Sequence, residues 1–282
     1  GFEDFYRGDV GREIAGDLER IGAPVLREDL ARYRAVLREP LRLDLPGRAL
    51  INTPPPTVGL ISLVTLGLFE RLGVARAESF EHIHGLVEAS KRALALRDRA
   101  CVDFDAPRPD PASFLSSKFL EREAAKIDMK RAAAWPLPPE EGDTIWMGAI
   151  DASGLAVSYI QSLFWEYGSG CVLPATGILL QNRGVSFSLD AAHPNALAPG
   201  KRPMHTLNAP LCVFDDGRVM SYGSMGGDGQ PQFQAQILSR YMFSGNVASA
   251  VDAPRFRFDK RWGAPRATLK LEERFDPSIV AR

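Results

Sequence analysis

The chain has 282 residues, enough for one large domain or two small ones with a well-buried core. Its 34 Lys and Arg residues nearly balance its 35 Asp and Glu residues, so charge gives no reason to expect nucleic acid or a membrane surface as a partner. The apolar runs are too short to span a bilayer. The cysteines Cys101, Cys171 and Cys212 are odd in number and widely spaced, which indicates reduced, mostly buried thiols.

The first half is predicted to be mainly helical. An amphipathic helix with Ile14 and Leu18 on its apolar face ends at Gly22. Further helices are predicted at 27–33, 59–72, 80–96 and 114–127, and a strand pair at 41–51. His82 and His84 are two positions apart on one helix and face different sides, so they do not form a metal-binding pair. The Ala/Pro/Glu-rich stretch 128–142 is predicted to be a mobile linker where chain scission is tolerated.

The second half is predicted to consist mainly of strands. Two strands, 144–150 and 155–161, are joined by the turn Asp151-Ala152-Ser153-Gly154. Other expected elements are a buried strand at 177–180, a hairpin at 211–222, a helix at 231–243 and a strand at 268–271. Helices followed by strands favour a layered α/β arrangement in which helices cover the sheets.

Thr144, at the start of the first of these strands, is a candidate nucleophile. A threonine hydroxyl is weak at its ordinary pKa and requires an adjacent base. If the Asp143–Thr144 bond is cut, the new α-amino group, with a pKa of roughly 7.7–8, could serve as that base. One residue would then supply both groups in fixed proximity. The alternative is an ordinary threonine at a strand start.

Gly226 and Gly227 are candidate oxyanion-hole residues. Two successive backbone N–H groups without side chains can turn toward a developing negative charge. An ordinary turn before a helix is the structural alternative. A phosphate-binding loop is a further alternative, but the segment lacks the Lys-Ser/Thr of a P-loop.

Several ordered motifs extend across nearly the whole chain. They are Phe5-Tyr6-Arg7-Gly8, Asp29-Leu30-Ala31-Arg32-Tyr33, Pro54-Pro55-Pro56, Asp143-Thr144, Thr176-Gly177-Ile178-Leu179-Leu180-Gln181-Asn182, Pro199-Gly200-Lys201-Arg202-Pro203, Gly223-Ser224-Met225-Gly226-Gly227 and Asp252-Ala253-Pro254-Arg255-Phe256. In these motifs the chain resembles the γ-glutamyltranspeptidase family of N-terminal nucleophile hydrolases. The motifs around Arg183-Gly184, His205-Thr206-Leu207-Asn208 and Gly227-Asp228-Gly229-Gln230-Pro231-Gln232 are similar to its oxamate amidohydrolase branch.

The resemblance implies a four-layer αββα fold and autocatalytic cleavage before Thr144. Residues 1–143 would be the C-terminal part of the large-subunit region, and residues 144–282 would be the small-subunit region that carries the nucleophile. Family proenzymes are considerably longer, so we expect the fold to be incomplete at both ends. The resemblance also implies Gly226 and Gly227 as the oxyanion hole.

The chain departs from the family where glutamate would be bound. Family members carry acidic residues after the Asn of the Asn182 motif, whereas this chain has Arg183 and no carboxylate through Phe187. The family's paired serines are here His205 and Thr206. A threonine that supports the nucleophile corresponds to Ile160, with Gln161 and Ser162 beside it.

These changes favour a small carboxylate-amide such as oxamate over a γ-glutamyl compound. Arg183 could pair with the substrate carboxylate, although a structural ion pair is an equal alternative. Ser162, Asn182, His205 and Thr206 are the other substrate-binding candidates, and for His205 packing is at least as good an explanation.

The sequence therefore predicts an N-terminal threonine amidohydrolase that acts on a small-molecule amide and needs no metal or cofactor. A genuine γ-glutamyl hydrolase or transferase is the alternative within the enzyme class, and an uncleaved non-catalytic member or fragment is the alternative outside it. We expect the two subunits of one precursor to be partners, in a homodimer or heterotetramer, with no nucleic acid or membrane. A cytoplasmic rather than periplasmic location is expected, although no natural N-terminus is visible.

Overall fold

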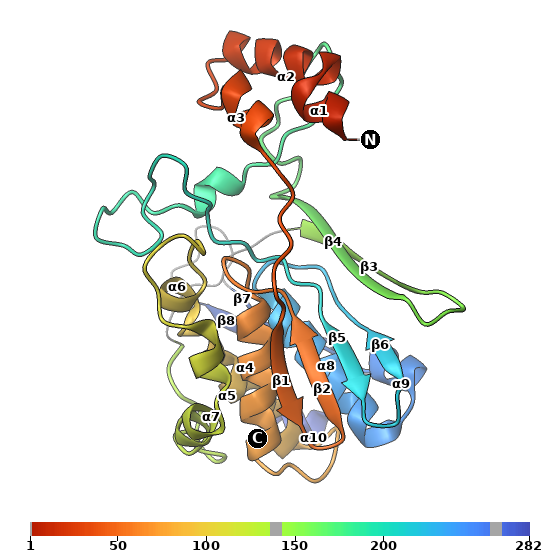
Figure 1. Cartoon of the computed structure of the whole chain (residues 1–282). Coiled ribbons are helices and arrows are strands. Elements are labelled where there is room, and N and C mark those ends of the chain that lie inside the picture. Colours follow the sequence, from red (N-terminus) through yellow and green to blue (C-terminus); the bar gives the residue numbers. More distant parts are fainter. Residues whose placement is uncertain (1, 136–142, 260–266) are drawn as a thin grey trace. The chain divides into compact units, whose positions relative to one another are not determined.

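The computed structural model describes residues 2–135, 143–259 and 267–282 (Figure 1). The chain forms two compact units, one from Gly1–Arg38 with Leu163–Arg183 and the other from Glu39–Ser162 with Gly184–Arg282. The linker predicted at 128–142 falls partly on 136–142, outside the described residues.

The first unit is a small helical cluster closed by a returning loop. Its helices are α1 (Glu3–Arg7), α2 (Asp9–Arg20) and α3 (Arg27–Arg32). The apolar face of α2 buries Ile14 and Leu18 against Leu173 of the loop. The buried Asp17 carboxylate accepts the Ala175 N–H at 3.0 Å, which joins the loop to the helix. The predicted helices near 14–22 and 27–33 are confirmed.

The second unit is built on a four-stranded antiparallel sheet. Its strands are β1 (Leu41–Leu45), β2 (Arg48–Asn52), β5 (Leu211–Phe214) and β6 (Val219–Ser221), in the order β1-β2-β5-β6. Leu50 of β2 lies opposite Leu43 on one side and Cys212 on the other. The strand pair predicted around Gly47 and the later hairpin are both confirmed.

Helices α4 (Gly59–Arg71), α5 (Phe80–Leu94) and α8 (Gly229–Ser244) form the core of this unit. Helix α4 packs against β1, β2, α5 and α8, and its residues from Gly59 to Phe69 are all buried. Each fully buried Leu or Ile contributes about 1.5–3 kcal/mol relative to an exposed one, so α4 is a main source of core stability. Helix α5 is capped by Ser79, whose Oγ accepts the His82 N–H at 3.1 Å.

The remaining elements show where the sequence predictions were incomplete. They are α6 (Arg97–Ala100), η1 (Pro111–Leu115), α7 (Ser117–Ala124), β3 (Asp143–Ile150), β4 (Ala156–Phe164), η2 (Arg183–Ser186), α9 (Val247–Asp252), β7 (Phe256–Asp259), β8 (Thr268–Leu271) and α10 (Pro277–Val280). The helix predicted at 114–127 is divided because Ser116 is extended and caps α7 instead. Helix α8 begins at Gly229, two residues earlier than predicted.

The predicted buried strand at 177–180 is wrong. Gly177 has a φ of 70°, and its N–H donates to the Leu173 carbonyl at 2.7 Å, so the chain makes a tight turn here. Only one isolated bridge, between Val172 and Leu179, is recorded in this segment. The apolar run that suggested a strand instead packs Ile178 and Leu180 against the α2 cluster.

Candidate active site

Strands β3 and β4 form a two-stranded hairpin in the second unit. The Asp151 carboxylate fixes its turn by accepting the N–H groups of Ser153 at 2.8 Å and Leu155 at 3.0 Å. This side-chain turn explains why the predicted Asp-Ala-Ser-Gly segment reverses the chain. Both predicted strands are confirmed, and Thr144 is the second residue of β3.

The Thr144 hydroxyl contacts a hydroxyl on the partner strand. Thr144 Oγ1 donates to Ser162 Oγ at 3.1 Å, and both residues are partly exposed. Ser158, Ile160 and Ser162 alternate along the more covered face of β4. The family resemblance places the supporting threonine at Ile160, whose side chain has no polar group. The hydroxyl that reaches Thr144 belongs to Ser162.

Gly226 and Gly227 lie in the loop that connects β6 to α8. Their φ angles are 107° and 56°, and a Cβ on Gly226 would lie 3.3 Å from the Phe233 ring. These left-handed conformations are strained for other residues, so both positions favour glycine. Their carbonyls accept the N–H groups of Gly229 at 2.8 Å and Gln230 at 3.1 Å, which starts the helix. Both glycines are buried.

An ion pair holds the residue that follows the two glycines. Arg97 of α6 donates from Nη1 to Asp228 Oδ2, and both side chains are buried. Removing one partner of a buried pair leaves the other charge uncompensated, at a cost of about 3–5 kcal/mol. The glycine pair is therefore attached to a rigid helix N-terminus.

His205 and Thr206 lie beside the proline-rich loop of the same unit. The His205 N–H donates to the Pro56 carbonyl at 2.9 Å, and its own carbonyl accepts the Val58 N–H at 2.9 Å. Thr206 is fully buried. These contacts show that His205 positions the backbone at the start of α4.

Arg183 and Asn182 belong to the first unit. The Arg183 guanidinium carbon lies 4.1 Å from the centre of the Phe164 ring, and the side chain is only 3 % exposed. The Asn182 side-chain carbonyl accepts the Trp165 N–H at 3.2 Å. Within this unit, Asn182 orders the chain just after β4, and Arg183 stacks on an aromatic face.

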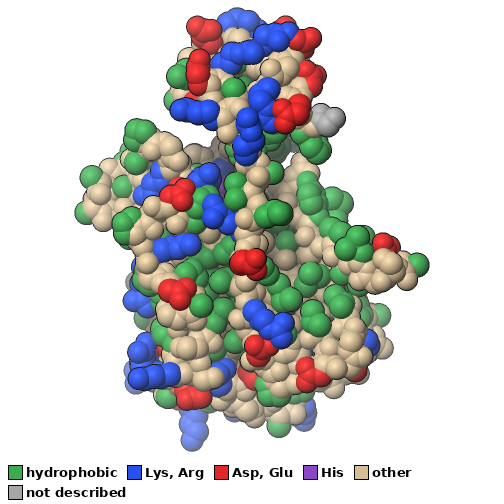
Figure 2. All heavy atoms as spheres, in the orientation of Figure 1, with side chains coloured by type: hydrophobic (Ala, Val, Ile, Leu, Met, Phe, Trp, Pro, Cys, Tyr) green, Lys and Arg blue, Asp and Glu red, His purple; other side chains and the backbone are tan. Residues whose placement is uncertain are grey.

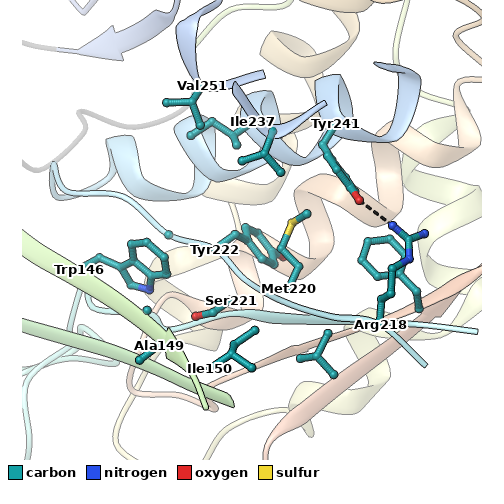
Figure 3. Close-up of a pocket in the computed structure, with 15 residues that line it drawn as sticks. Trp146, Ala149, Ile150, Arg218, Met220, Ser221, Tyr222, Ile237, Tyr241 and Val251 are labelled. Atoms are coloured by element: carbon teal, nitrogen blue, oxygen red, sulfur yellow. Dashed lines mark hydrogen bonds between the residues drawn. The ribbon is translucent and has the colours of Figure 1, made fainter. Parts of the chain in front are cut away.

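An apolar pocket of about 610 Å³ lies beside β3, the strand that carries Thr144 (Figure 3). It is lined by residues of β3, β5, β6, α8 and α9, among them Trp146, Ile150, Met220, Ile237 and Val251. At one side Arg218 Nη1 donates to the Tyr241 hydroxyl at 2.8 Å. Thr144, Gly226 and Gly227 are not among the described residues that line it. The lining does include Trp146 and Gly223, which lie two residues from Thr144 and three residues from Gly226.

Hydrophobic side chains gather on the surface of the second unit, over its strands (Figure 2). On the β3–β4 hairpin, Ile145 is 57 % exposed and Met147 is 49 % exposed. They alternate with Thr144 and Trp146, which are more covered. The hairpin therefore has one face turned to solvent and one face turned to β6.

Two of the three cysteines are buried, and burial affects the pKa of each of these two thiols. Burial raises the pKa of the Cys212 thiol to about 11 and that of Cys101 further, so both stay protonated at neutral pH. Cys171 is exposed, so two of the three cysteines are buried, as the sequence predicts. Among the residues that the structure describes, no His, Cys, Asp and Glu groups are clustered as metal ligands, and none of the described helices is long and apolar enough to cross a membrane.

Comparison with known proteins shows which family the chain resembles. The family model described as Gamma-glutamyltranspeptidase matches residues 1–282. The chain is 46 % identical over 283 residues to the oxamate amidohydrolase proenzyme of Klebsiella pneumoniae, covering 100 % of this chain and 54 % of that protein. It is 35 % identical over 290 residues to the glutathione hydrolase-like YwrD proenzyme of Bacillus subtilis, with coverage of 100 % and 54 %.

A solved structure gives the same result for the fold. Cephalosporin acylase from Bacillus halodurans aligns with a TM-score of 0.88 and 32 % identity, over 99 % of this chain and 51 % of that one. The predicted α/β class of the N-terminal nucleophile hydrolase type is therefore confirmed. The chain spans about half the length of the curated relatives it matches. A match over its full length shows that the chain belongs to the γ-glutamyltranspeptidase family.

Proposed function

We propose that this chain forms part of an N-terminal threonine amidohydrolase, cut before Thr144, that hydrolyses a small amide. The observation that carries the proposal is the hydrogen bond of 3.1 Å from Thr144 Oγ1 to Ser162 Oγ on the facing strand. It holds the hydroxyl that would become the nucleophile. Membership of a family whose similar members are named as proenzymes supports cleavage.

The cleavage step uses the same hydroxyl. Thr144 Oγ1 attacks the Asp143 carbonyl carbon, the peptide C–N bond breaks, and the nitrogen leaves as the free α-amine of Thr144. Water then hydrolyses the resulting ester, which restores the hydroxyl and leaves a carboxylate on Asp143. Ser162 orients Thr144 for the attack, so we assign it to positioning the nucleophile rather than to binding substrate.

Amide hydrolysis repeats this chemistry on a substrate. The Thr144 amine accepts the hydroxyl proton, Oγ1 attacks the amide carbon, and the N–H groups of Gly226 and Gly227 stabilise the oxyanion. The protonated amine returns its proton to the leaving nitrogen, which departs as ammonia from a primary amide. Water activated by the same amine then hydrolyses the acyl ester. Activity should rise as the amine loses its proton, near pH 7.7–8 by its roughly expected pKa.

We propose oxamate or a related small carboxylate-amide as the substrate. A relative at 46 % identity is named an oxamate amidohydrolase proenzyme. The buried guanidinium of Arg183 would pair with the substrate carboxylate, because Arg offers a planar fork of donors to that group. Asn182, His205 and Thr206 complete the residues proposed to shape the site. No acidic side chain follows Arg183 as far as Phe187 to hold a substrate ammonium.

Two alternatives remain, a γ-glutamyl hydrolase or transferase and an uncut, non-catalytic member. The first is supported by relatives named glutathione hydrolase proenzymes, such as that of Escherichia coli at 28 % identity. For the leading proposal we expect the two pieces of the chain to act together, in a homodimer or heterotetramer, in the cytoplasm.

Cleavage is tested with purified protein on a denaturing gel. The natural sequence should give two bands, and N-terminal sequencing of the smaller piece should begin at Thr144. Thr144→Ala should remain one band and release no ammonia from oxamate. A single band for the natural sequence after long incubation would favour the non-catalytic alternative, and full turnover by Thr144→Ala would refute the nucleophile.

Substrate class is tested by two parallel assays. We expect ammonia release from oxamate and slow p-nitroaniline release from γ-glutamyl-p-nitroanilide. Arg183→Ala should raise KM for oxamate at least tenfold, whereas Arg202→Ala is a control for loss of an arginine from the second unit. Fast anilide hydrolysis without oxamate hydrolysis would favour the γ-glutamyl alternative.

A further inference from the structure

Trp146, two residues after the proposed nucleophile, packs against the loop that carries the glycine pair. We propose that Trp146 is a positioning residue that fixes the distance between Thr144 and the oxyanion-hole loop. The proposal rests on the function proposed above, and it gives Trp146 a role in that function. Figure 3 shows the indole between β3 and β6, at the edge of the apolar pocket.

The first observation is the closeness of the indole to Gly223. A Cβ on Gly223 would lie 2.3 Å from Cδ1 and Cγ of the ring and 2.4 Å from Cδ2. The five-membered part of the indole therefore rests directly on the backbone of Gly223. Gly223 lies two residues after β6 ends at Ser221 and precedes Gly226 by three residues, so the ring supports the start of this loop.

The second observation is a hydrogen bond that fixes the ring on its own hairpin. Trp146 Nε1 donates to Ser158 Oγ of β4 at 2.9 Å. An indole has one polar atom, and a partner for it sets the orientation of the whole ring. The hydrogen bond therefore holds the ring face against Gly223.

A third contact joins the hairpin to β6 beside the indole. Ser221 Oγ donates to the Val157 carbonyl of β4 at 3.0 Å. A Cβ on Gly148 would lie 2.7 Å from Ser221 Oγ and 2.9 Å from two carbons of the Trp146 ring. Gly148 thus permits the close approach of β3 and β6 that the stacking of Trp146 on Gly223 requires.

These three contacts connect Thr144, the proposed nucleophile, to the loop that carries Gly226 and Gly227. Thr144 and Trp146 lie on the same face of β3, and Gly223 begins the segment that ends in Gly226 and Gly227. A misplacement of about 1 Å between reacting groups can cost about 100-fold in rate. Changing the ring should therefore lower the rate of chemistry more than the affinity for substrate.

The test compares Trp146→Phe, Trp146→Ala, Ser158→Ala and Gly223→Ala in the full chain. The readouts are the half-time of self-cleavage, kcat and KM for oxamate, and the midpoint of thermal unfolding. Met147→Ala is the matched control, because Met147 is the neighbouring residue on the solvent-facing side of β3 and is 49 % exposed.

We expect Trp146→Phe and Ser158→Ala to lower kcat and slow self-cleavage about tenfold, with KM changed less than threefold. Trp146→Ala should cost about 100-fold in kcat, in line with the sensitivity of catalysis to geometry. Gly223→Ala alone should lower kcat as much as Trp146→Ala does. Combined with Trp146→Ala it should lower kcat little further, because the alanine at 146 leaves room for the new Cβ at 223. Met147→Ala should match the natural sequence.

The proposal is overturned if Trp146→Phe and Trp146→Ala keep kcat and self-cleavage within twofold of the natural sequence. It is also overturned if Gly223→Ala and Trp146→Ala lower kcat independently, since additive effects would exclude their contact as the cause. Thr144→Ala separates this outcome from failure of the proposed function. If Thr144→Ala still cleaves and turns over, the nucleophile is wrong, whatever Trp146 does.

Discussion

Ser162 supplies a hydroxyl that Thr144 contacts, and its removal tests how closely the proposed nucleophile must be held. Ser162→Ala deletes the acceptor 3.1 Å from Thr144 Oγ1 without adding bulk. Loss of one hydrogen bond changes stability by only about 0.5–1.5 kcal/mol, but a nucleophile free to rotate loses its near-attack geometry. We expect kcat and the rate of self-cleavage to fall at least tenfold, measured by ammonia release and by gel.

Ser162→Thr provides the conservative rescue for this experiment. It keeps the hydroxyl, so turnover should stay within threefold of the natural sequence. Ser153→Ala removes a serine from the turn of the same hairpin and should leave kcat unchanged. Equal activity of Ser162→Ala and Ser153→Ala would show that the contact has no catalytic role.

His82 makes stability depend on pH. Burial, and to a smaller extent the nearby positive charge of Arg240, lower the pKa of this imidazole from 6.5 to about 4. The folded state therefore favours neutral His82, whose Nε2 lies 2.9 Å from Ser239 Oγ. This contribution to stability is complete above pH 6.5 and is lost as the pH falls toward about 4.

We therefore expect the free energy of unfolding to fall by about 2 kcal/mol between pH 7 and pH 5 because of His82. Urea unfolding at both pH values should show a smaller difference for His82→Gln than for the natural sequence. His84→Gln removes a half-buried imidazole from the same helix and serves as the control. An unchanged difference for His82→Gln would contradict the assignment.

Two glutamine side chains of helix α8 hydrogen-bond the backbone of β7, as a neighbouring strand would. Gln236 accepts the Phe256 N–H at 2.9 Å and donates to the Phe256 carbonyl at 2.9 Å. Gln232 makes the same two contacts with Phe258, so the two amides cover the edge of β7. Both glutamines are fully buried, although glutamine is mostly exposed in proteins.

Gln236→Leu should therefore destabilise the protein although it makes the helix more apolar. The substitution leaves a buried backbone N–H and C=O without partners, at a cost of about 1–3 kcal/mol each. Urea unfolding should show a loss of at least 2 kcal/mol, whereas Gln161→Leu on the exposed side of β4 should lie within about 0.5 kcal/mol of the natural sequence. A neutral or stabilising Gln236→Leu would mean that β7 is not held by this amide.

This use of side chains explains which elements the sequence could predict. Helices α4 and α5 have continuous or periodic apolar faces, and local pattern identified both. Strand β7 could not be predicted from the sequence, because its Phe-Arg-Phe-Asp run is short and its edge is hydrogen-bonded by helix side chains. The segment at 177–180 looked like a strand because its residues are apolar, but the left-handed Gly177 turns the chain.

Some residues of the candidate site could likewise be predicted from the sequence, whereas the contacts between them could not. Thr144, Gly226 and Gly227 could be proposed from the sequence because they stand in ordered motifs. The contact of Ser162 with Thr144 and that of Trp146 with Gly223 depend on which strand residues face each other. A shift of one residue in strand register reverses the faces, so composition and spacing could not fix either contact.

At the scale of the whole second unit, elements from both sides of the Asp143–Thr144 bond are interleaved. The sheet pairs β2 from before this bond with β5 from after it, and α4 packs against α8. The buried pair of Arg97 and Asp228 also crosses the division, as does the bond of 2.7 Å from Ser62 Oγ to Gln234 Oε1. One hydrophobic core is thus shared by the two pieces that the proposed cleavage would produce.

The two pieces of the cut chain should consequently remain together. Their separation would expose the apolar surface of α4 and α8 and the backbone edges of β2 and β5, at roughly 25 cal/mol for each Å² of apolar surface. We expect fully cleaved protein to elute from a size-exclusion column at the volume of intact Thr144→Ala, with both bands in one peak on a denaturing gel. The pieces should separate only over the urea range in which tryptophan fluorescence reports unfolding. Two separate peaks in native buffer would show that the interleaved sheet and helices do not hold the cut chain together.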